Sequence, residues 1–66
     1  MNIGKTIKEL RRECNMSQTE LANKLFISQD TVSLWERGKS NPDIEMLIEL
    51  TKIFNVSSDY LLGLEK

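Results

Sequence analysis

One short segment of the sequence, residues 29–37, carries the side chains best suited to recognition chemistry. Built as a helix at about 100° per residue, it turns Val32 and Trp35 to one side. The opposite side carries an amide, a carboxylate, a hydroxyl, an aliphatic group and a guanidinium: Gln29, Asp30, Ser33, Leu34 and Arg37. These groups match base edges in the DNA major groove, where glutamine suits adenine, arginine guanine, an acid cytosine and an apolar group the thymine methyl. Taken alone, such a face is more typical of a solvated surface helix.

Other chemistry is poorly supported by the residue types. The chain has no histidine and one cysteine, Cys14, so it offers neither an internal disulfide nor a set of zinc ligands. It also lacks a nucleophile with a matching base and a glycine-rich phosphate loop. We therefore expect no metal, no cofactor and no enzymatic activity. Cys14 follows Leu10 at helical spacing, which predicts a buried structural thiol.

Length and charge set the scale of the molecule. Sixty-six residues with 39% hydrophobic side chains predict one small domain, residues 1–66, with a single core. The net charge is −1, but residues 1–41 hold seven lysines and arginines against five acids, whereas residues 42–66 hold two against five. This asymmetry permits binding of a polyanion on one side without requiring it. With no apolar run of membrane-spanning length and no signal peptide, we expect a cytoplasmic protein without a membrane partner.

Helix signals divide the chain into five short helices. Apolar residues at helical spacing predict a first helix over about residues 3–14, and Ser17 with Glu20 forms a capping box that begins a second over about 18–25. Ser28 is the expected cap of a third helix that runs to Arg37 and stops at Gly38. A fourth begins after Asn41 or Asp43 and reaches about residue 54. A fifth starts at the Ser57 cap and stops at Gly63, while Asn15 and Asn55 provide left-handed turns.

The order of these motifs resembles one family closely. The segments SQTELA (17–22) and SQDTVSLWERG (28–38), followed by NPD (41–43) and VSSDYLLG (56–63), resemble the lambda-repressor/Cro-like (Xre-type) family over about residues 3–63. The resemblance implies an all-α, compact five-helix lambda-repressor-like domain with a helix-turn-helix at about residues 18–37. It departs at Phe26, where the family usually has glycine. If a positive φ is kept there, either the ring packs to offset the strain or the turn differs slightly.

The resemblance also implies roles for particular residues. Helix three would enter the major groove, and contacts to the DNA backbone would come from Gln18, Ser28, Thr31, Lys39, Ser40 and Asn41. The Thr31 hydroxyl is equally suited to satisfying the start of its own helix. In relatives, an arginine and a glutamate at the positions of Arg11 and Glu36 pair between helices one and three. With Val32 and Trp35 they would support the recognition helix.

These observations favour sequence-specific binding of double-stranded DNA by a transcriptional regulator, with repression by promoter occupancy favoured over activation. The alternative is a protein-interaction or antitoxin-like module that keeps the fold without binding DNA on its own, and the negative net charge supports it. Relatives imply a homodimer on a palindromic operator, and no small-molecule ligand is evident. Leu61, Leu62 and Leu64 either form the dimer surface or cover the base of a small monomer.

Overall fold

The computed structural model describes residues 2–64 and contains, within them, five helices and no strand. The helices are α1 (Ile3–Glu13), α2 (Gln18–Leu25), α3 (Gln29–Glu36), α4 (Ile44–Phe54) and α5 (Ser58–Leu61). The all-α, five-helix prediction is confirmed, and α1 and α3 each end one residue earlier than expected. None of the helices in this part of the chain is long and apolar enough to cross a membrane.

Local capping explains where the helices begin. The Ser17 hydroxyl accepts from the Glu20 N–H and the Glu20 carboxylate accepts from the Ser17 N–H, at 3.0 and 2.9 Å, so the predicted capping box is present. Ser28 and Ser57 cap α3 and α5 as predicted. Asp43, rather than Asn41, caps α4 by accepting from the Met46 N–H at 2.9 Å.

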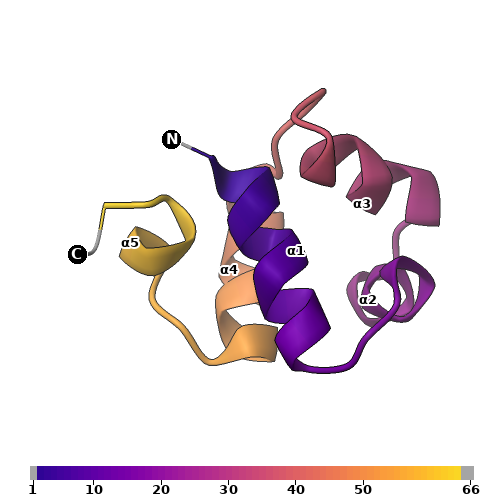
Figure 1. Ribbon diagram of the computed structural model, residues 1–66, viewed down its shortest axis with the longest axis horizontal. Coiled ribbons are helices and arrows are strands. Elements are labelled where there is room, and N and C mark those ends of the chain that lie inside the picture. The colour runs from indigo at the N-terminus through magenta and orange to yellow at the C-terminus, as the bar shows by residue number, and fades with distance from the viewer. Residues whose placement is uncertain (1, 65–66) are drawn as a thin grey trace.

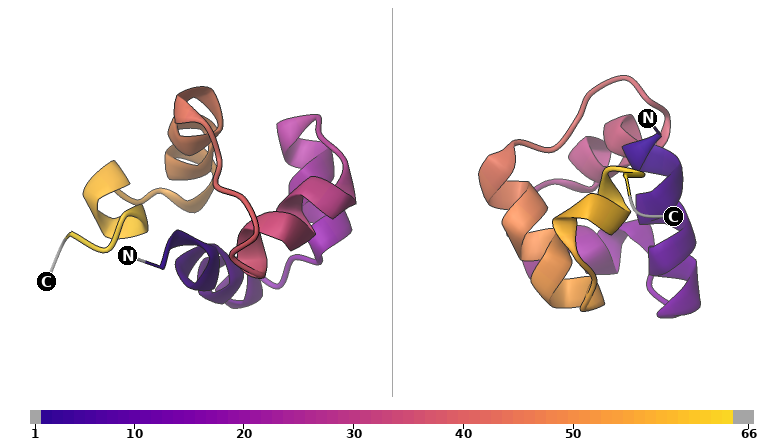
Figure 2. Two further views of the ribbon diagram at one scale, coloured as in Figure 1. Left: turned by 90° about the horizontal axis from the view of Figure 1, so that it is seen from above. Right: turned by 90° about the vertical axis from the view of Figure 1, so that its left-hand side faces the viewer.

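The helices surround a single core. α3 packs against both α1 and α2, and α5 packs against α1 and α4. In Figures 1 and 2, α2 and α3 lie on one side of α1, α5 lies on the other, and α4 lies behind α1. The buried apolar residues come from all five helices: Ile3, Ile7, Leu10, Leu21, Ala22, Leu25, Val32, Trp35, Leu50, Phe54 and Leu61. Because α3 contributes Val32 and Trp35, the core fixes which face of α3 points outward.

One prediction of burial was wrong. Cys14 is exposed instead of buried, because α1 ends at Glu13 and the chain turns at Asn15. Met16 packs against the core instead. Of the leucines predicted to form either a dimer surface or the base of a monomer, Leu61 is fully buried and Leu62 packs against the core. Both belong to the domain's own core.

A residue with positive φ follows each of the five helices in the described part of the chain. Asn15 and Asn55 have φ of 55° and 54°, as their residue type predicts, and Gly38 and Gly63 also have positive φ. Phe26 keeps the same conformation at φ 58° and ψ 41°, although it carries a bulky side chain. Its side chain is 95% exposed, so ring packing does not offset the strain.

A close contact between α1 and α3 was not anticipated from the sequence. Gly4 lies in the first turn of α1, directly against the Trp35 carbonyl of α3. A Cβ at this position would overlap that backbone oxygen, so only glycine allows α1 to approach α3 this closely. Gly4 therefore helps to set the orientation of α3.

Candidate nucleic-acid interface

The α2–turn–α3 unit presents one face of α3 to solvent. Gln29, Asp30 and Arg37 are exposed, Leu34 is 37% exposed and Ser33 is half-buried. The side chains predicted from helical periodicity to face outward therefore do so. Four of these residues lie on α3, whose opposite face is buried in the core, and Arg37 is the C-cap residue of the same helix.

The first residues of α2 and α3 are joined by their side chains. The Gln29 Nε2 donates to the Gln18 Oε1 at 2.6 Å, and the Gln18 Nε2 donates to the Glu36 Oε1 at 3.0 Å. Each glutamine directly follows a capping serine, Ser17 or Ser28, at the start of its helix. Sequence reasoning did not link the two glutamines. The repeated Ser-Gln at both helix starts, brought together by the turn, is the signal that could have done so.

An ion pair beneath these glutamines connects α1 to α3. The Arg11 Nε donates to the Glu36 Oε2 at 2.8 Å, its Nη2 donates to the Glu36 Oε1 at 3.1 Å, and its Nη1 donates to the Met16 carbonyl at 2.7 Å. The two side chains are 11% and 3% exposed, so water screens the pair poorly. The expected pairing of these two residues is therefore present, in bidentate form.

The pair shifts both ionisation equilibria toward the charged forms. The hydrogen bond to Glu36 raises the pKa of Arg11 and outweighs desolvation. Burial would raise the pKa of Glu36, but hydrogen bonds from Arg11 and Gln18, with the nearby charges of Arg11 and Lys8, outweigh it, so the pKa of Glu36 is lowered. Glu36 is thus a charged acceptor at neutral pH.

The residues expected to contact phosphates lie in three places: the loop after α3, the start of α2 and the start of α3. Lys39, Ser40 and Asn41 are exposed in the loop after α3. Gln18 opens α2, where the first backbone N–H groups of a helix have no intrahelical partner and suit anions. The Thr31 hydroxyl lies 3.0 Å from the Ser28 hydroxyl at the start of α3, which favours a local role for Thr31.

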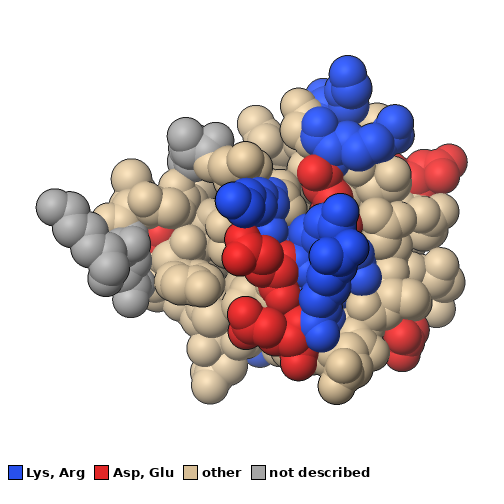
Figure 3. Space-filling view, viewed as in Figure 1, with Lys and Arg blue, Asp and Glu red and all other residues tan. Residues whose placement is uncertain are grey.

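The charge distribution is mixed over the face shown in Figure 3. Lysine and arginine side chains gather over α1 and near the loop after α3, with acidic side chains among those of α1. This face therefore has local basic groups mixed with acidic ones and no broad patch of a single charge sign.

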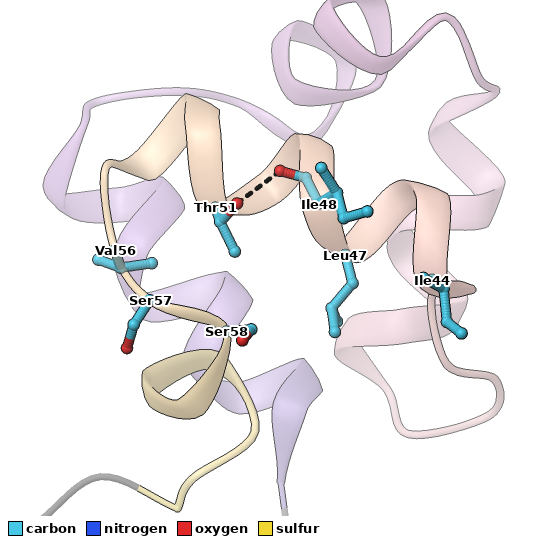
Figure 4. Close-up of a pocket in the computed structure, with 7 residues that line it drawn as sticks. All are labelled: Ile44, Leu47, Ile48, Thr51, Val56, Ser57 and Ser58. Atoms are coloured by element: carbon cyan, nitrogen blue, oxygen red, sulfur yellow. Dashed lines mark hydrogen bonds between the residues drawn. The ribbon is translucent and has the colours of Figure 1, made fainter.

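A separate apolar groove lies between α4 and the start of α5. It has a volume of about 360 Å³ and is lined by Ile44, Leu47, Ile48, Thr51, Val56, Ser57 and Ser58. Figure 4 shows these side chains on α4 and on the segment leading into α5. None of them belongs to α2 or α3, so this groove is not part of the candidate interface.

The five-helix core and the α2–turn–α3 unit, with an exposed polar face on its second helix, define the class of helix-turn-helix proteins. A family model described as "Helix-turn-helix" matches residues 7–61, which is most of the chain. The chain belongs to this family, the lambda-repressor-like or Xre-type helix-turn-helix proteins.

Similar proteins include regulators and a phage repressor. The chain is 43% identical over 63 residues to the HTH-type transcriptional regulator ImmR of Bacillus subtilis, covering 96% of this chain and 50% of ImmR. It matches the c2 repressor of phage P22 in complex with a synthetic operator with a TM-score of 0.90 and 31% identity over 98% of both chains. It matches the biofilm regulator SinR in complex with DNA with a TM-score of 0.82 and 36% identity, covering 91% of this chain and 97% of that one. The chain thus spans about half the length of ImmR.

Proposed function

We propose that this chain is a sequence-specific DNA-binding domain of a transcriptional regulator that represses by occupying a promoter. In this proposal α3 enters the major groove, where its outward residues read base edges, and the start of α2 lies on the DNA backbone. The protein acts as a regulator, not as an enzyme, and works in the cytoplasm.

One observation carries the proposal: the start of α2 and the start of α3 meet at an exposed corner, where Gln18 and Gln29 are hydrogen-bonded. This places a helix N-terminus suited to phosphate beside an amide suited to a base edge. The likeness to the P22 c2 repressor bound to its operator supports the same orientation of the two helices.

We further propose that the chain binds as a homodimer, at least on DNA, to a palindromic operator. Of the three leucines first considered for a dimer surface, Leu64 is 67% exposed and the other two belong to the core. Twofold binding predicts half-sites about one helical turn, roughly 34 Å, apart.

The protein-interaction or antitoxin-like alternative is not favoured. Its support was the net charge of −1, yet the exposed groups of α3 are varied and polar, and two of the similar structures contain DNA. A low net charge weakens steering toward DNA but leaves base contacts intact.

Selection of bound sequences from a random DNA pool, followed by fluorescence anisotropy over a salt series, tests the proposal. We expect an enriched inverted repeat and a log–log salt slope of about −0.9 for each phosphate neutralised. An interaction module would instead give no enriched sequence and no salt dependence.

A further inference from the structure

Four side chains from three helices form one continuous chain of hydrogen bonds. It runs from Arg11 of α1 to Glu36 of α3, from Glu36 to Gln18 of α2, and from Gln18 to Gln29 at the start of α3. The inner end is buried, because the Glu36 side chain is 3% exposed, and the outer end, Gln29, is exposed. A buried charge is thus connected to the solvent-facing amide of α3.

The carboxylate of Glu36 determines which atom of each glutamine donates and which accepts in this series of hydrogen bonds. A carboxylate accepts hydrogen bonds and donates none, so Gln18 must turn its Nε2 toward Glu36. The Gln18 Oε1 then faces Gln29, and Gln29 must donate to it from its own Nε2. One N–H of Gln29 is used in this way. Its second N–H and its Oε1 therefore project in one fixed arrangement.

A fixed amide distinguishes bases that a rotating amide does not. Adenine presents N7 as an acceptor and N6 as a donor, whereas guanine presents acceptors at both N7 and O6. With its orientation fixed for adenine, Gln29 would hold its Oε1 where guanine places O6, and two acceptors would repel. An amide free to rotate would turn its Nε2 toward O6 and tolerate guanine.

We propose that Glu36 is a positioning residue for base recognition: acting through Gln18, it fixes the amide orientation of Gln29 and so makes this position selective for adenine over guanine. The inference rests on the proposed function, since it assigns a further residue to the same interface. Glu36 need not touch DNA to do this.

The ion pair with Arg11 keeps Glu36 charged and in place, so the orientation of both glutamines depends on this pair. Arg11 is itself held by the Met16 carbonyl, so both members of the pair are anchored. If Glu36 only stabilised the fold, its hydrogen bond from Gln18 would have no effect on base preference. A role in positioning requires that bond.

The test separates the two roles with variants that break different links. Gln18→Met removes both hydrogen bonds of the Gln18 side-chain amide but leaves the ion pair between Arg11 and Glu36. Glu36→Gln keeps the side-chain shape but presents Gln18 with either a donor or an acceptor. Gln29→Ala identifies the base position concerned. Lys39→Ala, in the loop outside the chain of hydrogen bonds, is the matched control for a general loss of affinity.

Each folded variant is titrated against the wild-type site and its single-base substitutions. We expect Gln18→Met and Glu36→Gln to reduce the preference for adenine over guanine about tenfold, at the one position where Gln29→Ala abolishes it. Lys39→Ala should weaken all sites equally. The side-chain amide NMR signals of Gln29 in the DNA-free protein should shift in Gln18→Met, which shows that the link is broken independently of DNA.

A uniform loss of affinity in Gln18→Met and Glu36→Gln, with base preferences unchanged, would overturn this inference while leaving the proposed function standing. A wild-type protein without any sequence preference would overturn the proposed function and this inference together. Unshifted Gln29 side-chain amide signals in Gln18→Met would also overturn the role of Glu36, because the hydrogen bond between Gln18 and Gln29 would then not exist in solution.

Discussion

Replacing Phe26 with glycine should stabilise this domain, although it removes a large hydrophobic side chain. Phe26 holds φ 58° and ψ 41° at the end of α2, in the left-handed region that disfavours any residue with a Cβ. Its side chain is 95% exposed, so the ring contributes almost no burial. The substitution therefore relieves strain and removes little packing.

The size of the effect follows from two opposing contributions. A non-glycine residue in this region costs about 1–2 kcal/mol. Glycine has more freedom in the unfolded chain, which lowers the gain by roughly 0.5–1 kcal/mol. The net stabilisation of Phe26→Gly should be about 0.5–1 kcal/mol, which corresponds to a rise in Tm of roughly 2–8 °C for a domain of this size.

Thermal unfolding followed by circular dichroism, together with urea denaturation, measures this change. Phe26→Ala is the matched control, because it removes the ring but keeps the Cβ, and its stability should stay within about 0.5 kcal/mol of wild type. Phe26→Asn should fall between the two, since Asn15 and Asn55 adopt the same conformation. If Phe26→Gly is no more stable than Phe26→Ala, the strain argument is wrong.

Three further predictions test different parts of the molecule. Gln29→Ala should cost about 1–3 kcal/mol on the preferred DNA site and relax one base position, whereas Lys39→Ala should weaken every site and flatten the salt slope by about one unit, both measured by anisotropy over a site library. Gly4→Ala should destabilise the fold by about 1–3 kcal/mol in urea denaturation, because its Cβ meets the Trp35 carbonyl; an unchanged midpoint would mean that α1 shifts without strain. Because the pKa of Glu36 is lowered from 4.5, its contribution to folding stability should be present above pH 4.5 and lost as the pH falls below it. The urea midpoint of the wild type should therefore fall more steeply on acidification than that of Glu36→Gln, and parallel pH profiles would contradict this.

Capping and periodicity predicted most of the fold because they act over a few residues. The Ser17–Glu20 capping box and the left-handed Asn15 and Asn55 depend on neighbours in the chain, so their residue types suffice. The outward face of α3 was also predictable, since it follows from a period of 3.6 residues. Cys14 shows the limit: it continues the apolar stripe of α1, but the helix ends one residue too early to bury it.

Long-range contacts were predictable only where the family resemblance supplied them. Arg11 and Glu36 lie 25 residues apart, and nothing local to either residue pairs them. Gly4 illustrates the opposite case, because glycine is unfavourable inside a helix and its reason lies in the Trp35 carbonyl of another helix. Local propensity therefore argues against the residue that the packing of α1 on α3 requires.

The candidate site adds a physical reason why residue types alone were insufficient. An amide carries a donor and an acceptor, so the sequence indicates that Gln29 is able to pair with a base but not which atom faces outward. That orientation depends on what the inner atom contacts, and here the contact is Gln18, whose own orientation depends on a buried carboxylate. In the proposal above, the base preference at the surface of α3 then depends on the buried, ionised carboxylate of Glu36. The exposed residues of α3 alone do not indicate this dependence.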